Sequence, residues 1–239
     1  MTHHRRRNNG IDPSKINETV ELSPAQRYAA FKQTQAKQRT VAAEFARSMP
    51  FELDEFQMQA NDALEAGDNV LVAAPTGAGK TVAADFAIYL AQTRNVKAFY
   101  TTPIKALSNQ KYHDLVDQYG TDKVGLLTGD TSINSEADIV VMTTEVLRNM
   151  LYEHSVTLEA LRYVILDEVH YLADRFRGPV WEEVIIHLPK NVNIIGLSAT
   201  VSNVEDFSEW IESVRGKTTL VMSEQRPVPL EQHVLVQAD

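Results

Sequence analysis

A glycine-containing loop between an apolar run and a helical segment is the part of this sequence best suited to chemistry. The apolar run covers residues 69–74, the helical segment covers residues 82–92, and the residues of the loop are Ala74, Pro75, Thr76, Gly77, Ala78, Gly79, Lys80 and Thr81. Backbone N–H groups of such a loop and of the next helix converge on phosphate oxygens, where Gly77 and Gly79 leave space. Lys80 would contribute a positive charge to the β- and γ-phosphates, and Thr81 a hydroxyl to Mg²⁺.

The alternative for this loop is a chance glycine turn with an exposed lysine. Ala74 stands where the general phosphate-loop pattern has its first glycine, which is one departure from that pattern. The apolar run before the loop and the helical segment after it are, however, the context that the motif requires. The sequence therefore predicts a site for ATP and Mg²⁺.

Two carboxylates follow a second apolar run, residues 163–166, and these are Asp167 and Glu168. Parallel sheets bind ligands at the carboxyl ends of their strands. We expect Asp167 to hold Mg²⁺ through water, and Glu168 to orient and deprotonate the attacking water. Acids at a strand end can also be ordinary helix caps, but the phosphate loop favours the functional interpretation. His170 lies beside the pair and is a further catalytic candidate.

Composition excludes several classes of protein. The 239 residues contain no cysteine, so disulfides, iron–sulfur clusters and thiolate zinc sites are excluded. The apolar runs are far shorter than the roughly 18 residues that a membrane span needs, so we expect no membrane contact, and we predict a cytoplasmic protein. The net charge of −9 disfavours a nucleic-acid partner unless the basic residues gather on one face.

The arrangement of apolar runs predicts an α/β fold. The runs cover residues 69–74, 97–102, 124–128, 138–143, 163–167 and 193–198, and helical segments separate them. Such alternation indicates a mostly parallel central sheet with helices on both faces. A further run that begins at Thr218, with Leu220, Val221 and Met222, looks like an edge strand, and residues 234–236 form another apolar run.

The N-terminal part of the chain is predicted to lie outside this fold. Residues 1–22 have a His-Arg-rich start with no apolar stretch behind it, which indicates a disordered arm rather than a secretory signal. Ser23 and Pro24 are a helix-start pair, and we expect a helix to about Ser48. This helical extension, residues 23–50, would be a surface brace in which Tyr28, Phe31, Val41 and Phe45 rest on a neighbour.

From about Phe51 onward the chain resembles the Ski-like, exosome-associated branch of superfamily-two DExH helicases and their bacterial relatives. Seven segments carry the resemblance, in order: 51–57, the loop that ends in Lys80 and Thr81, 102–107, 128–130, 143–145, 167–170 and 198–200. Residues 174–183 look like the stretch that separates this branch from DEAD-box and DNA-repair helicases. The resemblance implies that residues 51–239 form a RecA-like P-loop domain, the first motor domain of a helicase, which favours single-stranded RNA as partner, with DNA possible.

The resemblance also implies a base-binding role for two residues. Gln57 would read the adenine edge and Phe51 would pack against the base. The alternative for Gln57 is structural, because Asp54 and Gln57 have the spacing of a capping box at a helix start.

A set of polar and small residues resembles the positions that follow the sugar–phosphate backbone. Small donors and cations of this kind bind phosphate without reading sequence. They are Pro103, Lys105, Gly129, Thr143, Thr144 and Arg148. Thr143 and Thr144 could equally cap a helix. Ser198 and Thr200 would couple the nucleotide site to the nucleic-acid face, or would only satisfy a turn.

Helicases of this type close a second RecA-like domain over ATP, and this domain supplies arginines to the γ-phosphate. No such segment follows Asp239, so we expect a monomeric chain that binds MgATP but is nearly inactive alone. An arginine finger contributes about 10³ to 10⁵ in rate in other nucleotide hydrolases. With the second domain, the resemblance implies 3′-to-5′ translocation. The alternatives are a DNA-repair translocase of the same superfamily and a nucleotide-gated binding module, while an unrelated P-loop transporter subunit is disfavoured.

Overall fold

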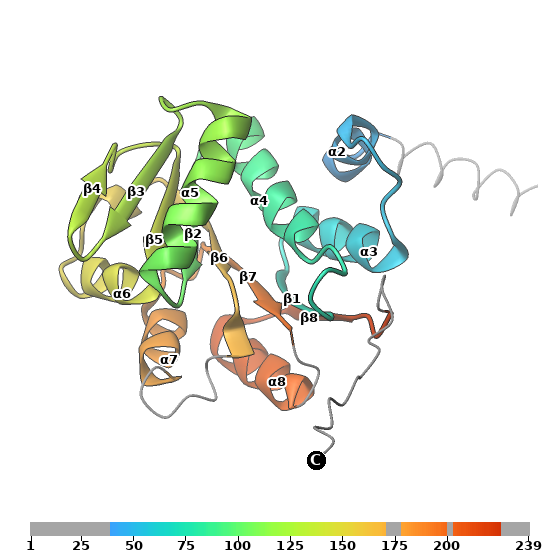
Figure 1. Ribbon diagram of the computed structural model, residues 1–239. Helices are drawn as coiled ribbons and strands as arrows, with labels where there is room; N and C mark the ends of the chain where they lie inside the picture. Colours follow the sequence, from blue (N-terminus) through green and yellow to red (C-terminus); the bar gives the residue numbers. More distant parts are fainter. Residues whose placement is uncertain (1–38, 171–177, 200–202, 226–239) are drawn as a thin grey trace, which may run out of the picture. The chain divides into compact units, whose positions relative to one another are not determined.

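An eight-stranded sheet forms the centre of the protein, seen in a computed structural model that describes residues 39–170, 178–199 and 203–225 (Figure 1). The strand order is β4-β3-β5-β2-β6-β7-β1-β8, and every neighbouring pair is parallel except β3 with β4. The strands are β1 Asn69–Ala73, β2 Lys97–Thr102, β3 Val124–Thr128, β4 Thr131–Ile133, β5 Ile139–Thr143, β6 Leu161–Leu166, β7 Asn193–Ser198 and β8 Thr218–Met222.

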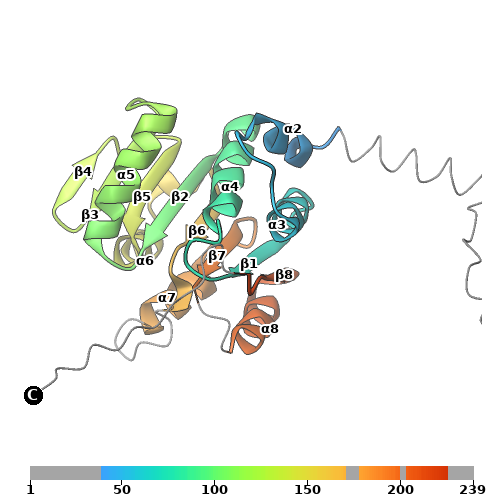
Figure 2. The same ribbon diagram turned by 45° about the vertical axis from the view of Figure 1, so that its right-hand side comes forward.

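Helices cover both faces of this sheet, which confirms the predicted fold class (Figures 1 and 2). One face packs against α3 Glu55–Glu65, α4 Thr81–Arg94 and α5 Lys105–Tyr119, and α2 Val41–Ser48 packs on α3 and α4. The other face packs against α6 Thr144–Tyr152, α7 Gly178–His187 and α8 Val204–Arg215. The short 3₁₀ helix η2 Val156–Leu158 precedes β6. Within the described residues, no helix combines the length and the apolar character that crossing a membrane requires.

The strands are apolar at consecutive positions because both faces of the sheet are buried. Side chains alternate across a strand, so Val70 and Val72 of β1 belong to the core under α3 and α4, whereas Leu71 and Ala73 belong to the core over α7 and α8. All four are at most 2% exposed. This double burial explains why the runs could be recognised from the sequence.

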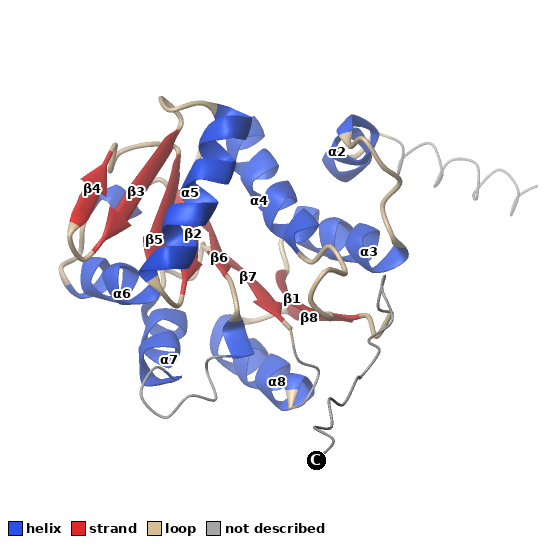
Figure 3. Ribbon diagram, in the orientation of Figure 1, coloured by secondary structure: helices blue, strands red, loops and turns tan. Residues whose placement is uncertain are grey.

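The predicted strands agree with the observed ones to within two residues at each end. β8 pairs only with β1 in the sheet order, so it is the edge strand that was expected. One strand was not predicted: β4, three residues long, pairs antiparallel with β3 at the opposite edge (Figure 3). Residues 234–236 lie outside the described part of the chain.

The prediction of one continuous helix that ends at about Ser48 was wrong at its N-terminal side. Arg39 and Thr40 form a turn and a bend, and α2 begins at Val41. The carboxylate of Glu65 causes this start, because it accepts hydrogen bonds from the backbone N–H groups of Val41, at 2.9 Å, and Ala42, at 2.7 Å. Residues 1–38, including the predicted arm and the predicted contacts of Tyr28 and Phe31, lie outside the described residues.

The predicted contact of Phe45 is confirmed. Phe45 is 3% exposed, and its ring centroid lies 5.2 Å from that of Phe86 and 5.4 Å from that of Tyr89, both on α4. The helix α2 therefore packs inside the compact unit that begins at Val41.

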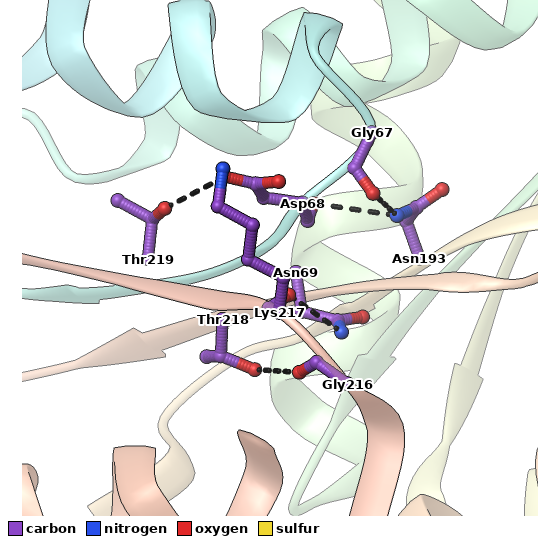
Figure 4. A network of polar contacts seen from close by, with 8 residues as sticks. All are labelled: Gly67, Asp68, Asn69, Asn193, Gly216, Lys217, Thr218 and Thr219. Atoms are coloured by element: carbon purple, nitrogen blue, oxygen red, sulfur yellow. Dashed lines mark hydrogen bonds and ion pairs between the residues drawn. The ribbon is translucent and has the colours of Figure 1, made fainter.

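A polar network joins the amino ends of β1, β7 and β8 (Figure 4). The Asn69 side chain accepts a hydrogen bond from the Ile194 backbone and donates one to the Lys217 carbonyl. Asp68 pairs with Lys217 at 2.9 Å and accepts a hydrogen bond from Thr219. These contacts fix the strand register at the edge opposite the carboxyl ends.

Candidate functional site

The carboxyl ends of six neighbouring strands lie level with one another at one edge of the sheet. The register pairs Ala73 with Ser198 and Leu166 with Gly196, so Asp167 is level with the end of β7 to within about one residue. Only β7 separates β1 from β6, which puts their ends roughly 10 Å apart at the usual strand spacing. The phosphate loop and the Asp167-Glu168 pair therefore share one edge of the sheet.

The phosphate loop has the backbone conformation that its glycines predict. Gly77 and Gly79 have φ angles of 84° and 83°, which L side chains rarely adopt. A Cβ atom on Gly79 would lie 2.5 Å from Nε2 of Gln57, so a side chain there would also have to displace the Gln57 amide. Ala74, which replaces the first glycine of the general pattern, is fully buried, and its N–H donates to the Ser198 carbonyl at 3.1 Å.

The donor set of the loop suits a triphosphate with its magnesium ion. In the described part of the chain, the backbone N–H groups of Gly79, Lys80 and Thr81 have no hydrogen-bond acceptor. The Lys80 ammonium lies over the loop, where it donates to the Pro75 carbonyl at 3.4 Å. Thr81 is exposed at the first residue of α4, and Thr76 is exposed within the loop. Unpaired amides, a cation and a hydroxyl at a helix N-terminus could bind an anion and supply one ligand to a metal ion.

The carboxylate of Asp167 is held at both oxygens. Its Oδ1 accepts a hydrogen bond from the Glu168 backbone at 2.9 Å, and its Oδ2 accepts one from the Tyr100 hydroxyl at 2.7 Å. Burial raises the pKa of Tyr100 well above its ordinary value, and the negative charge of Asp167 raises it further, so the phenol remains a donor. The sequence did not reveal Tyr100, because an aromatic residue in a buried strand gives no signal beyond core packing.

Glu168 occupies an uncommon backbone conformation. Its φ is 56°, in the left-handed region, which is unusual for a residue with a side chain and typical of functional turns. Its Oε2 lies 3.2 Å from Nδ1 of His170, a contact that is an ion pair when the imidazole is protonated. His170 therefore contacts the predicted base directly.

The side-chain amide of Gln57 makes two hydrogen bonds. Its Oε1 accepts a hydrogen bond from the Asp54 backbone at 2.9 Å, which is half of the capping box that begins α3. Its Nε2 donates to the Gly79 carbonyl at 3.0 Å. The structural alternative for Gln57 is thus confirmed, and the same amide also touches the phosphate loop.

A cavity of about 340 Å³ opens beside this contact, between the start of α3, the phosphate loop and the segment after β8. It is lined by Asp54, Phe56, Gly77, Ala78, Gly79, Ser223 and Gln225. Phe51, three residues before Asp54, is 50% exposed. The sequence did not point to Ser223 or Gln225, because they approach the loop only through the pairing of β8 with β1.

The candidate nucleic-acid residues lie at or after the carboxyl ends of β2, β3 and β5, the other half of the same edge. The register keeps Thr102 level with Thr143, and Leu127 level with Met142. Lys105 and Gly129 are exposed, Arg148 is partly exposed, and Pro103, Thr143 and Thr144 are buried. A Cβ atom on Gly129 would meet nothing within 4 Å, so packing does not require glycine there.

Both predicted cations of this half contact a carboxylate. Lys105 Nζ lies 2.6 Å from Oδ1 of Asp130, and this contact, with a hydrogen bond from Thr128, holds the pKa of Asp130 below its ordinary value. Arg148 Nε lies 3.8 Å from Oε2 of Glu183 on α7.

The threonines at the start of α6 are placed differently from each other. Thr143 is at the N-cap position, but its side chain makes no capping hydrogen bond. Thr144 is 1% exposed, and its hydroxyl donates to the Thr102 carbonyl at 3.3 Å, which ties β5 to β2. Ser198 is buried at the end of β7, and Thr200 lies outside the described residues.

Comparison with known proteins shows to which family the chain belongs. Residues 54–207 match the family described as DEAD/DEAH box helicase. The chain is 63% identical over 192 residues to the probable helicase HelY of Mycobacterium tuberculosis, and the matched region covers 80% of this chain and 21% of HelY. It is 52% identical over 187 residues to the antiviral helicase SKI2 of Saccharomyces cerevisiae, covering 78% of this chain and 14% of SKI2. The chain thus spans about a fifth or less of the length of these relatives.

Solved helicase structures share the fold. The Mycobacterium smegmatis helicase Lhr, bound to single-stranded DNA and AMP-PNP, superposes with a TM-score of 0.59 at 31% identity, covering 70% of this chain and 25% of Lhr. The DUF1998 helicase MrfA, bound to DNA and AMPPNP, gives a TM-score of 0.62 at 26% identity, covering 77% of this chain and 29% of MrfA. The RecA-like sheet, the phosphate loop and a family match over more than half of its length together assign this chain to the DEAD/DEAH box helicase family.

Proposed function

We propose that this chain is the first motor domain of an ATP-dependent nucleic-acid helicase, and that it binds MgATP between the phosphate loop and the Asp167-Glu168 pair. The observation that carries the proposal is the common edge of β1, β7 and β6, where the loop, Ser198 and the two acids end level with one another. RecA-like sheets bind ligands at this edge.

Each group at the edge has a role in phosphoryl transfer. Lys80 and the free amides of the loop bind the β- and γ-phosphates, and Thr81 with Asp167 would hold Mg²⁺. When bound, Mg²⁺ neutralises charge that develops on the phosphate oxygens. Glu168 orients the attacking water and accepts its proton, and His170, 3.2 Å away, would hold the Glu168 carboxylate when its imidazole is protonated.

Adenine binding is proposed for the cavity beside α3. Gln57 keeps one unused Nε2 hydrogen and one unused Oε1 lone pair after its contacts with Gly79 and Asp54. These match the N7 acceptor and the N6 donor of adenine. The half-exposed ring of Phe51 would pack against the base.

Nucleic acid is proposed to lie along the β2-β5-β3 half of the edge, where Lys105 and Gly129 are exposed. Gly129 supports this placement, because neither packing nor its backbone conformation requires glycine, whereas close approach of a phosphate backbone would. Pro103, Thr143, Thr144 and Arg148 would complete the surface, with the buried Thr144 contributing backbone rather than hydroxyl. Ser198, with Thr200, would couple the nucleotide half of the edge to its nucleic-acid half.

Single-stranded RNA is the proposed partner, and 3′-to-5′ movement the proposed direction, for a protein in which a second RecA-like domain completes the ATP site. Relatives of this chain include proteins named as RNA helicases, such as DExH15 of Arabidopsis thaliana, at 50% identity. A DNA translocase is the second candidate, because the solved structures of Lhr and MrfA contain DNA. Competition between RNA and DNA strands of one base sequence, at a stated salt concentration, separates the two.

The test of the nucleotide site is Lys80→Ala. The lost charge–phosphate contact is worth about 1.5–3 kcal/mol, so calorimetry should show MgADP affinity reduced about tenfold or more. Lys217→Ala is the matched control, because Lys217 is an exposed, carboxylate-paired lysine at the opposite edge of the sheet. Equal affinities of the Lys80→Ala and unaltered chains would overturn the proposal.

A further inference from the structure

Tyr100 is a buried side chain that the proposed chemistry has not used. It lies in the middle of β2, is 1% exposed, and directs its hydroxyl at Asp167 across the sheet, where it donates to Oδ2 at 2.7 Å. Its strand neighbours are β5 on one side, which pairs Tyr100 with Val141, and β6 on the other, which pairs it with Ile165. The hydroxyl therefore reaches the end of the adjacent strand from within the core.

The ring of Tyr100 is contacted by a side chain of α5. The ammonium of Lys111, on α5, lies 4.9 Å from the ring centroid, a cation–π contact. Lys111 also lies 3.8 Å from Asp85 on α4, the helix that begins directly after the phosphate loop. The ring of Tyr100 is therefore contacted from α5, and the contacting lysine is paired in turn with α4.

The consequence concerns the orientation of the Asp167 carboxylate. The Glu168 N–H holds Oδ1 and the Tyr100 hydroxyl holds Oδ2, so the plane of the carboxylate is fixed from both sides. Each oxygen keeps a further lone pair for water on a metal ion. Without the hydroxyl, Oδ2 would lose its protein donor, and the carboxylate could rotate about its side-chain bond.

We propose that Tyr100 is a positioning residue, which acts through Asp167 to orient the carboxylate toward the magnesium ion of the nucleotide. The inference rests on the proposed function of Asp167. Groups that hydrogen-bond to a metal-binding carboxylate typically change metal affinity or activity by about 10- to 100-fold when they are removed.

The experiment is Tyr100→Phe in the 239-residue chain, which removes one oxygen and keeps the ring. Affinity for a non-hydrolysable ATP analogue is measured by calorimetry with Mg²⁺ and with a chelator. We expect the Mg²⁺-dependent gain in affinity to fall about tenfold, and the metal-free affinity to stay unchanged, because the phosphate loop keeps its contacts.

Tyr163→Phe is the matched control. Tyr163 is also a buried strand tyrosine, 2% exposed, and its hydroxyl interacts with Arg94 at the last residue of α4, far from the phosphate loop. This variant also loses one phenolic oxygen, but its Mg²⁺-dependent gain in nucleotide affinity should remain. Thermal unfolding of both variants shows whether each one is folded at the temperature of the measurement.

A double-mutant cycle with Asp167→Asn shows whether Tyr100 acts through Asp167. In the Asp167→Asn background, Tyr100→Phe should cause no further loss of the Mg²⁺-dependent gain. An additive loss, an unchanged gain in the single variant, or an equal loss with and without metal would each overturn the inference and leave the nucleotide site standing. Failure of the unaltered chain to bind the analogue at all would instead overturn the proposed function.

Discussion

Lys105 and Asp130 form an exposed ion pair at the carboxyl edge, with side chains that are 46% and 68% exposed. Exposed pairs of this kind contribute little to stability, so stability does not explain the position of the lysine. The amino group is available to exchange a carboxylate oxygen for a phosphate oxygen. Asp130 would then act as a placeholder that keeps the lysine extended from the start of α5.

Lys105→Ala tests this role through the dependence of RNA binding on salt. Each phosphate contact on a single strand contributes about 0.7 to the slope of log K against log salt concentration. We expect the variant to lower the slope by about that amount and to weaken binding similarly for strands of different sequence. Fluorescence anisotropy at four or more salt concentrations measures both effects.

Lys123→Ala is the control for this measurement. Lys123 forms the same type of exposed pair, with Asp138, but it precedes β3 and so lies at the amino edge of the sheet. Its removal should leave the slope unchanged. If both variants lower the slope equally, Lys105 acts only through net charge, and the proposed path along the β2-β5-β3 half is wrong.

Residues of the site differed in how far the sequence could reveal them. Asp167 could be predicted because it directly follows the buried strand β6, and Lys80 because it ends the glycine loop that connects β1 to α4, so the chain itself places both at the edge. Tyr100 and Ser223 could not, because they approach the site through strand pairing. Gln57 gave two competing interpretations, and the amide is large enough to cap α3 and to contact the loop at once.

At the scale of elements, the two polar side-chain atoms of Asn61 stand out on α3. Asn61 is 1% exposed, and among the described residues neither its Nδ2 nor its Oδ1 has a hydrogen-bond partner. An unsatisfied buried polar group costs about 1–3 kcal/mol. The helix α3 stays packed despite this cost, because its apolar residues Ala60 and Leu64 are buried in the core beneath it, each only 1% exposed.

Replacement of Asn61 by the similarly shaped leucine should therefore stabilise the protein. We expect the free energy of unfolding to rise by about 1–2 kcal/mol, and the Tm by about 2–4 °C per kcal/mol for a domain of this size. Urea unfolding and calorimetry measure the two quantities. Asp62→Leu, at an exposed neighbouring position, controls for the higher helix propensity of leucine. A gain no larger than that of the control would show that the Asn61 amide carries no penalty.

The boundaries of elements were predictable only where local sequence decides them. Six parallel strands are long apolar runs buried on both faces, so their sequence is distinctive. β4 has three residues, none of them buried, and exists because the turn at Gly129 and Asp130 folds it back on β3. The start of α2 depends on Glu65, 24 positions later in the chain than Val41, and a local pattern cannot contain such a cap.

At the scale of the whole molecule, one sheet edge brings both candidate sites together. Strands β6, β7 and β1 end at the proposed nucleotide-binding residues, and β2, β5 and β3 end at the proposed nucleic-acid residues. The boundary falls between β2 and β6, which is where Tyr100 reaches across to Asp167. The net charge of −9 does not contradict nucleic-acid binding, because the relevant cations are a few residues at one edge.

Tyrosines that are wholly or partly buried give the molecule a predictable response to alkali. Burial, with Asp85 nearby, raises the pKa of Tyr119 from 10.0 to about 12. Burial also raises the pKa of Tyr163, although Arg94 opposes the shift. A raised folded-state pKa means that the folded protein keeps protons which the unfolded chain releases above pH 10. Their contribution to stability is therefore complete below pH 10 and is lost as the pH rises from 10 toward 12.

Tyr119→Phe should remove part of this loss of stability at alkaline pH. One group contributes at most about 1.4 kcal/mol per pH unit in this window, and Tyr119 contributes less because its ring is only partly buried and solvent screens its charge. Urea unfolding at pH 8, 10 and 11 should show that the free energy of unfolding of the variant increases relative to that of the unaltered chain as the pH rises. Tyr152→Phe, which changes a tyrosine that is 55% exposed on α6, is the matched control. A difference between the Tyr119→Phe and unaltered chains that stays constant from pH 8 to 11 would mean that the Tyr119 phenol ionises equally in the folded and unfolded states.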